Sequence, residues 1–211
     1  MPLPLTRPGN GWRLMVVLAA LTAAYGFATA LVGPPIFAPN LKASFVARPW
    51  GIYPHAFFGG IAMILGPFQF HRGLLRNRAR HRKVGQAYVA ACLIAGMAGL
   101  YMAIYSYGGM ITHLGFGGLA VALLTTTGLA FRAIKARDVA THREWMIRSY
   151  AMIFAAVMLR IEIPLLMIAT QGNFDVTYRI VAWLCWVPNI LVAELIVRQT
   201  RVTAAAGLPA F

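Results

Sequence analysis

Four of the five histidines in this 211-residue chain lie near the ends of long apolar runs. His55 and His113 stand early in two of these runs, whereas His81 and His142 lie just before two others. Two imidazoles on facing helices can hold a haem iron between them. The spacing therefore predicts one pair of b-type haem ligands, His55 with His113, at one end of a helix bundle. It predicts a second pair, His81 with His142, at the other end.

Small residues follow three of these histidines at a spacing of four residues, as Gly59, Gly117 and Gly85, whereas Met146 follows His142. Residues i and i+4 share a helix face, so each glycine opens space beside its imidazole for a macrocycle. Glycine is also common in membrane helices for plain packing, and histidine is stable at a membrane surface without a ligand. The haem-binding and cofactor-free interpretations therefore both stay open.

Charged residues also occur inside the later apolar runs. Arg160 and Glu162 share one run, and Glu194 lies near the end of the next. A charge at this depth costs roughly 3 kcal/mol, so each is expected to face the bundle interior and have a partner. Arg160 and Glu162 point about 200° apart on a helix and are not expected to pair. Arg160 is expected to bind a haem propionate, backbone carbonyls or an acid of another helix. Glu194 is expected to meet Arg148 or another residue of the basic connections.

The elements that must position these residues are membrane-spanning helices. The chain is 60% hydrophobic and only 11% charged, and a helix of about 20 apolar residues crosses ~30 Å of hydrocarbon. Helices are favoured because each backbone N–H finds its partner within the segment. We therefore predict an all-α fold, one transmembrane domain over residues 1–211 that forms a six-span helix bundle. The expected spans are 14–32, 53–70, 84–105, 110–131, 147–169 and 176–197.

Positive charge is distributed unevenly along the chain, whose formal net charge is +14. Most Lys and Arg residues lie in the connections 71–83 and 131–148 and near the two ends, whereas the alternate connections hold Lys42, Arg48 and Arg179. The positive-inside rule then predicts that both termini are cytoplasmic and that anionic lipid headgroups surround the basic connections. Basic residues that alternate with apolar runs argue against nucleic acid as a partner.

Local signals predict several helix ends and bends. Thr141 with Glu144 fits a capping box that starts the fifth span. Pro67, after a glycine, is expected to end or kink the second span, and Pro164 and Pro188 are expected to bend the last two. The first span also has a basic lead and an Ala-Thr-Ala ending typical of a cleaved signal peptide, but an uncleaved span is favoured by its length.

The sequence shows no motif typical of a cysteine redox or zinc site, of phosphate binding or of metalloprotease activity. Cys92 and Cys185 lie singly in apolar runs, which predicts buried core residues rather than a redox or zinc pair. The sequence contains no Gly-rich phosphate loop, no HExxH and no CxxCH. These residues do not decide whether the protein is an enzyme.

Three segments resemble a bacterial family of integral-membrane proteins known as a predicted membrane domain of unknown function. They are HRKVGQAYVAACLIAGMAGLYMA, HREWMIRSYAMIFAAVMLR and WLCWVPNILVAEL, and the resemblance covers about residues 50–198. It implies a multi-pass protein of the bacterial inner membrane. A remoter similarity is to six-span di-haem cytochromes b, in which the second and fourth helices hold one haem and the third and fifth the other. The matching positions are His55 with His113 and His81 with His142, although these histidines lie closer to the span ends.

The leading functional hypothesis is electron transfer through b-type haem, with a quinone or a partner subunit as the exchange partner. One alternative is a cofactor-free accessory or assembly subunit of a larger membrane complex, which the small size and the shallow histidines favour. A second alternative is a transporter of a small solute or lipid that uses Arg160. The chain lacks the repeated halves typical of many transporters.

Overall fold

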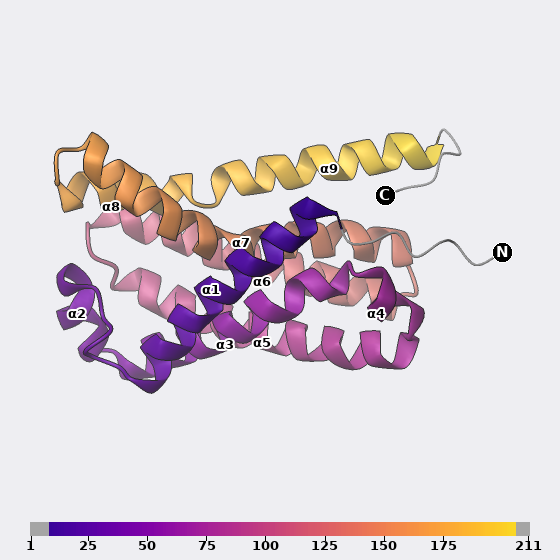
Figure 1. Cartoon of the computed structure of the whole chain (residues 1–211), viewed down its shortest axis with the longest axis horizontal. Coiled ribbons are helices and arrows are strands. Elements are labelled where there is room, and N and C mark those ends of the chain that lie inside the picture. Colours follow the sequence, from indigo (N-terminus) through magenta and orange to yellow (C-terminus); the bar gives the residue numbers. More distant parts are fainter. Residues whose placement is uncertain (1–8, 206–211) are drawn as a thin grey trace.

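The computed structural model describes residues 9–205, and within that range the chain forms helices and no strands (Figure 1). The two ends, 1–8 and 206–211, lie outside the described residues, and with them the positions of the termini. The helices are α1 (Asn10–Leu31), α2 (Pro39–Val46), α3 (Pro49–Gln69), α4 (Arg72–Arg76), α5 (Arg78–Ile104), α6 (Met110–Lys135), α7 (Val139–Ala169), α8 (Phe174–Leu184) and α9 (Val187–Ala205).

Six segments of the described chain are long and apolar enough to cross a membrane: α1, α3, α5, α6, α7 and α8 with α9. The prediction of an all-α, six-span fold is therefore confirmed. The helices extend beyond the expected spans, most clearly at α5, which begins at Arg78 rather than near residue 84. Arg, Lys and Gln are good helix formers, so the helices continue past the hydrocarbon into the basic connections.

The chain reverses direction between successive spans, so α2 lies at one end of the bundle and α4 at the other (Figure 1). The start of α1 and the end of α9 lie at the α4 end, as six spans require. The basic residues of α4, of the start of α5 and of the α6–α7 connection gather there as well. Lys42, in α2, lies at the opposite end. The separation of charge expected from the sequence is thus present in the fold.

The start of α7 differs from the sequence prediction. The helix begins at Val139, and its N-cap is Asp138, whose carboxylate accepts a hydrogen bond from the Thr141 backbone N–H at 3.0 Å. Thr141 was expected to be the N-cap and instead lies in the first turn, so that prediction was wrong. Asp and Thr both cap helices well. Asp138 is the cap here because starting the helix at this earlier residue adds a turn of backbone hydrogen bonds.

Asp138 gives a pH-dependent prediction. The Thr141 backbone N–H holds the pKa of this carboxyl below its usual range. A depressed pKa means that the cap stabilises the helix above the unfolded-state pKa of about 3.9 and is lost as the pH falls through the folded value. At neutral pH we expect Asp138→Ala to speed hydrogen exchange at the Thr141 amide. Asp138→Asn should keep the cap but remove its dependence on pH, and equal exchange in all three proteins at neutral pH would contradict the cap.

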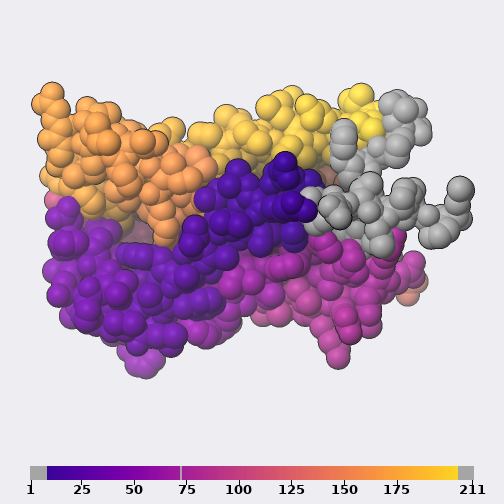
Figure 2. Space-filling view, viewed as in Figure 1, coloured from indigo at the N-terminus to yellow at the C-terminus, as the bar shows by residue number. Residues whose placement is uncertain are grey.

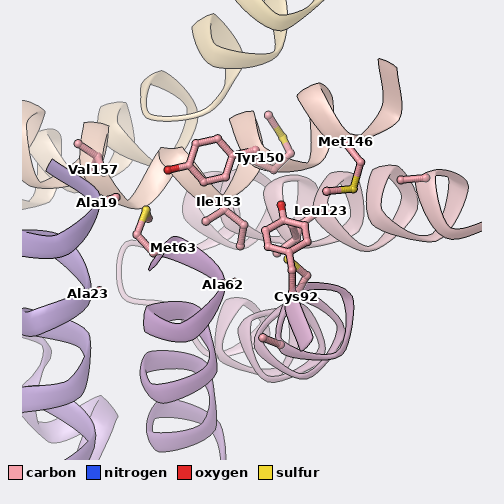
Figure 3. Packing of buried hydrophobic residues seen from close by; sticks show 14 residues of the cluster. Ala19, Ala23, Ala62, Met63, Cys92, Leu123, Met146, Tyr150, Ile153 and Val157 are labelled. Atoms are coloured by element: carbon pink, nitrogen blue, oxygen red, sulfur yellow. The ribbon is translucent and has the colours of Figure 1, made fainter. Parts of the chain in front are cut away.

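Small residues let the helices approach closely in the core (Figure 3). Ala19 and Ala23 of α1 and Ala62 of α3 are almost fully buried. A Cβ on Gly66 of α3 would lie 2.1 Å from the Tyr150 ring of α7, so that glycine is required for their contact. Close backbone approach through Ala and Gly is the usual way that membrane helices associate, because lipid supplies no hydrophobic driving force.

The two cysteines are buried and unpaired, as the sequence predicts. Cys92 lies in the core near a chain of buried hydroxyls. Tyr88 Oη lies 2.9 Å from Ser149 Oγ, which lies 2.8 Å from Thr127 Oγ1. These three hydroxyls link α5, α6 and α7, and each has a hydrogen-bond partner, as buried hydroxyls require.

The sixth span is interrupted between α8 and α9, at residues 185–186. The break lies just before Pro188, whose missing N–H and ring oppose a continuous helix. Side chains satisfy the carbonyls there. Asn189 Nδ2 donates to Cys185 O at 3.0 Å, and Trp186 Nε1 donates to Ala182 O at 3.0 Å.

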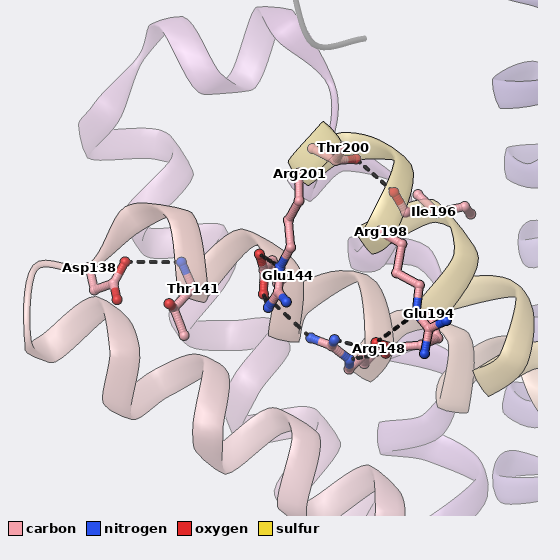
Figure 4. Close-up of polar contacts among 9 residues, drawn as sticks. All are labelled: Asp138, Thr141, Glu144, Arg148, Glu194, Ile196, Arg198, Thr200 and Arg201. Carbon is pink, nitrogen blue, oxygen red and sulfur yellow. Dashed lines mark hydrogen bonds and ion pairs between the residues drawn. The ribbon is translucent and has the colours of Figure 1, made fainter. Parts of the chain in front are cut away.

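An ion-pair network fastens α9 to α7 (Figure 4). Arg148 Nη2 lies 2.8 Å from Glu194 Oε2, and Arg148 Nη1 lies 3.8 Å from Glu144 Oε2. Arg201 Nε donates to Glu144 Oε1 at 2.6 Å. The Arg148 guanidinium also stacks 4.5 Å above the Trp145 ring. The expected meeting of Glu194 with Arg148 is confirmed.

Candidate functional site: a central cavity

A cavity of about 540 Å³ lies inside the half of the bundle nearer α2. We call it the central cavity; it is bounded by α1, α3, α5, α6 and α7, with part of α2 and one residue of α8. In the space-filling view, the indigo atoms of α1 cover one side of the bundle between α3 and α9 (Figure 2). The volume is typical of sites for small molecules and cofactors.

His55 of α3 lines the central cavity. Its Nδ1 lies 3.0 Å from the Ala95 carbonyl oxygen of α5. A carbonyl only accepts, so Nδ1 carries the hydrogen and Nε2 keeps its lone pair. The hydrogen bond thus holds the imidazole ring in one tautomer with a basic nitrogen that is available to a ligand.

Glycines surround this histidine. Gly59, one turn after His55, lines the cavity, and a Cβ there would meet no atom within 4 Å. The expected space beside the imidazole is therefore present. On α5, a Cβ at Gly99 would lie 2.9 Å from His55 Nδ1, so glycine is what allows the ring to reach the Ala95 carbonyl.

Arg160 of α7 lines the same cavity and lies within electrostatic range of His55. Its Nη1 donates to the Ala156 carbonyl at 2.7 Å, and its Cζ lies 4.7 Å from the centroid of the Tyr25 ring. Its Nε is buried and has no hydrogen-bond partner among the described residues. Glu162 does not pair with it, as the sequence predicts, but Glu162 Oε2 is itself buried without a hydrogen-bond partner among the described residues, so the expectation that each charge has a partner was wrong for Glu162.

The partner predicted for His55 lies elsewhere. His113 of α6 lines a separate, open groove of about 760 Å³ that runs along α6 toward Trp145 and Glu194. Its Nε2 lies 2.9 Å from the Ser106 carbonyl, which leaves Nδ1 as its remaining ring nitrogen. The structure therefore brings His55 together with Arg160 rather than with His113. A haem held between His55 and His113 stays a prediction.

The second predicted pair lies at the α4 end. His81 of α5 and His142 of α7 are close enough to interact electrostatically. His142 Nδ1 lies 2.8 Å from the Ala130 carbonyl, and His81 Nδ1 is buried without a hydrogen-bond partner in the described chain. Near Gly85 the space is partly filled, since a Cβ there would lie 3.2 Å from Gln69 Oε1. No cluster of three or more His, Cys, Asp or Glu residues occurs in the described part.

The short helix α2 covers one side of the central cavity, a feature that the sequence analysis did not predict. Ser44 lines the cavity and donates from Oγ to the Tyr105 carbonyl at 3.4 Å, and Arg48 Cζ lies 4.4 Å from the Tyr105 ring centroid. Tyr107, also in the lining, donates to the Asp175 carboxylate of α8, which raises the pKa of that hydroxyl. The one sequence signal for α2 was Pro39, which suits a first helical turn.

These observations define a six-span helical membrane protein whose central cavity is lined by one imidazole and one guanidinium. The chain belongs to the DUF2306 family of predicted membrane proteins, whose family model matches residues 52–197. Helix α1 lies before the matched segment. No curated protein and no solved structure matches the chain.

Proposed function

We propose that this protein transfers electrons in the inner membrane of a bacterial cell, through one b-type haem held in the central cavity with His55 as an axial ligand. The hydrogen bond from His55 Nδ1 to the Ala95 carbonyl carries this proposal. Histidines that ligate metals usually donate their other ring N–H to such an acceptor, which fixes the ring and makes the ligating nitrogen more basic.

The surroundings of His55 suit a haem in two further respects. Gly59, one turn after His55, leaves open space in the cavity lining for the edge of a flat macrocycle. Arg160, in the same lining, suits a haem propionate. A haem would supply one-electron chemistry, and a quinone or a partner subunit would exchange the electron.

The test is the absorption spectrum of the purified protein from haem-replete cells. We expect a Soret band in the wild type and a decrease of about tenfold or more in haem content for His55→Ala, because His55 is the single imidazole in the cavity lining. His113→Ala is the matched control and should keep the band, since His113 lines the other groove.

Two outcomes would count against the proposal. A folded wild-type protein without colour would remove haem altogether. Loss of the band in His113→Ala as complete as in His55→Ala would replace the single-histidine site with the bis-histidine site predicted from the sequence.

A further inference from the structure

Arg160 carries a charge that no acidic side chain of residues 9–205 neutralises. The protein has five acidic residues, and all of them lie in the described part: Asp138, Glu144, Glu162, Asp175 and Glu194. The ion pairs found among the described residues involve Glu144 and Glu194, each with arginines other than Arg160. An arginine inside a membrane span is costly unless it is paired, so the missing counter-ion is the feature to explain.

The contacts that Arg160 does make are incomplete. One backbone carbonyl and the face of Tyr25 are neutral partners, and Nε stays buried without one. The nearest acid in sequence, Glu162, forms no ion pair with Arg160, and its own Oε2 is buried without a hydrogen-bond partner among the described residues. A guanidinium in this state is suited to a carboxylate, which accepts two parallel N–H bonds and supplies the opposite charge.

The rest of the chamber is suited to an apolar body. Most of the lining is apolar, from small residues such as Ala23 and Ala56 to larger ones such as Leu159 and Ile163. Hydroxyl groups come from seven residues: Thr22, Tyr25, Thr29, Ser44, Ser106, Tyr107 and Tyr178. Apolar walls with a small number of placed polar groups are typical of sites that orient an amphipathic ligand. The apolar lining and the charge of Arg160 therefore both favour an amphipathic ligand that carries a carboxylate.

We propose that the central cavity recognises an amphipathic carboxylate, whose acidic group pairs with Arg160 and whose apolar body fills the space beside His55. This inference deepens the proposed function, since a haem propionate is one source of such a carboxylate. A long-chain fatty acid is another source of the same chemistry. The two sources are separated by titrating the protein with each of them directly.

The experiment compares free acids with their neutral esters on the purified full-length protein in detergent. One arm titrates the haem-free protein with protohaem and with its dimethyl ester, followed by the Soret band. The other arm titrates cis-parinaric acid and its methyl ester, followed by quenching of tryptophan fluorescence. We expect the wild type to bind each acid at least about tenfold more tightly than its ester, because the ester lacks the charge that Arg160 needs.

Substitutions test whether the preference for acid over ester depends on Arg160. Arg160→Gln should abolish the difference between acid and ester, and Arg160→Lys should keep part of it because the charge remains while the planar fork is lost. Arg179→Gln is the matched control: this arginine is in α8, outside the cavity lining, and its loss should change nothing. Arg160→Gln removes an unneutralised charge, so the variant should remain folded, which gel filtration checks. If it does not fold, the reduced preference for acid over ester in Arg160→Lys tests the role of Arg160.

The results separate this inference from the haem proposal. Haem binding with equal affinity for acid and ester would overturn the carboxylate site and leave the haem. No haem binding together with an Arg160-dependent preference for parinaric acid would overturn the haem and support the carboxylate site. Equal binding of both parinaric compounds by wild type and Arg160→Gln would also overturn it.

Discussion

Replacing Gly66 by alanine is expected to lower the free energy of unfolding by about 3 kcal/mol, at the upper end of the cost of overpacking. The added Cβ would lie 2.1 Å from both Cδ2 and Cε2 of Tyr150. Tyr150 is buried, and its ring also contacts Phe70 and Phe154, so it has little room to move. The measurement is equilibrium unfolding in mixed micelles of a mild detergent and dodecyl sulfate.

A second glycine provides the control. A Cβ at Gly128 of α6 would meet no atom within 4 Å, so Gly128→Ala should be neutral or slightly stabilising through helix propensity. The double variant Gly66→Ala with Tyr150→Leu should recover part of the loss, because the smaller side chain relieves the clash. Equal stability of Gly66→Ala and Gly128→Ala would show that α3 and α7 do not pack in this way.

Replacing Glu194 by alanine is expected to cost about 2 kcal/mol. The change leaves the Arg148 side chain, which is only 10% exposed, with a single carboxylate at 3.8 Å. Breaking a fully buried pair costs roughly 3–5 kcal/mol, and the value is smaller here because the Glu194 side chain is 37% exposed. The same unfolding assay, with hydrogen exchange along α9, measures the effect.

Arg198 allows a matched comparison at the same carboxylate. Its Nε lies 3.9 Å from Glu194 Oε1, and its side chain is 72% exposed. Exposed pairs contribute about 0–1 kcal/mol, so Arg198→Gln should be close to neutral. A cost for Arg198→Gln equal to that of Glu194→Ala would place the stabilising pair at the surface rather than at Arg148.

The helices and their order could be predicted because the signals are local. Hydropathy over about 20 residues and basic clusters between the runs report the spans without any knowledge of packing. Cys92 and Cys185 were correctly predicted as core residues for the same reason, since each lies in an apolar run. Helix ends were predicted less well, as Asp138 shows, because residues outside the hydrocarbon continue a helix according to capping and propensity rather than hydropathy.

The site could be predicted only in part. Helical spacing correctly places Gly59 beside His55, because four residues fix a shared face whatever surrounds it. The spacing of residues within one helix does not determine how that helix is rotated about its axis relative to its neighbours. That rotation turns His113 into the groove along α6 and Arg160 into the cavity with His55, so the pairing across helices depends on tertiary packing.

Helix α1 has a role that its position before the family segment does not suggest. Thr22, Tyr25 and Gly26 form one wall of the chamber, and the Tyr25 ring lies against Arg160. A peptidase that cleaved after Ala30 would detach that wall and open the compartment sideways to the acyl chains of the bilayer. Arg160 would then keep the Ala156 carbonyl as a hydrogen-bond acceptor but lose the aromatic face that Tyr25 presents to its guanidinium.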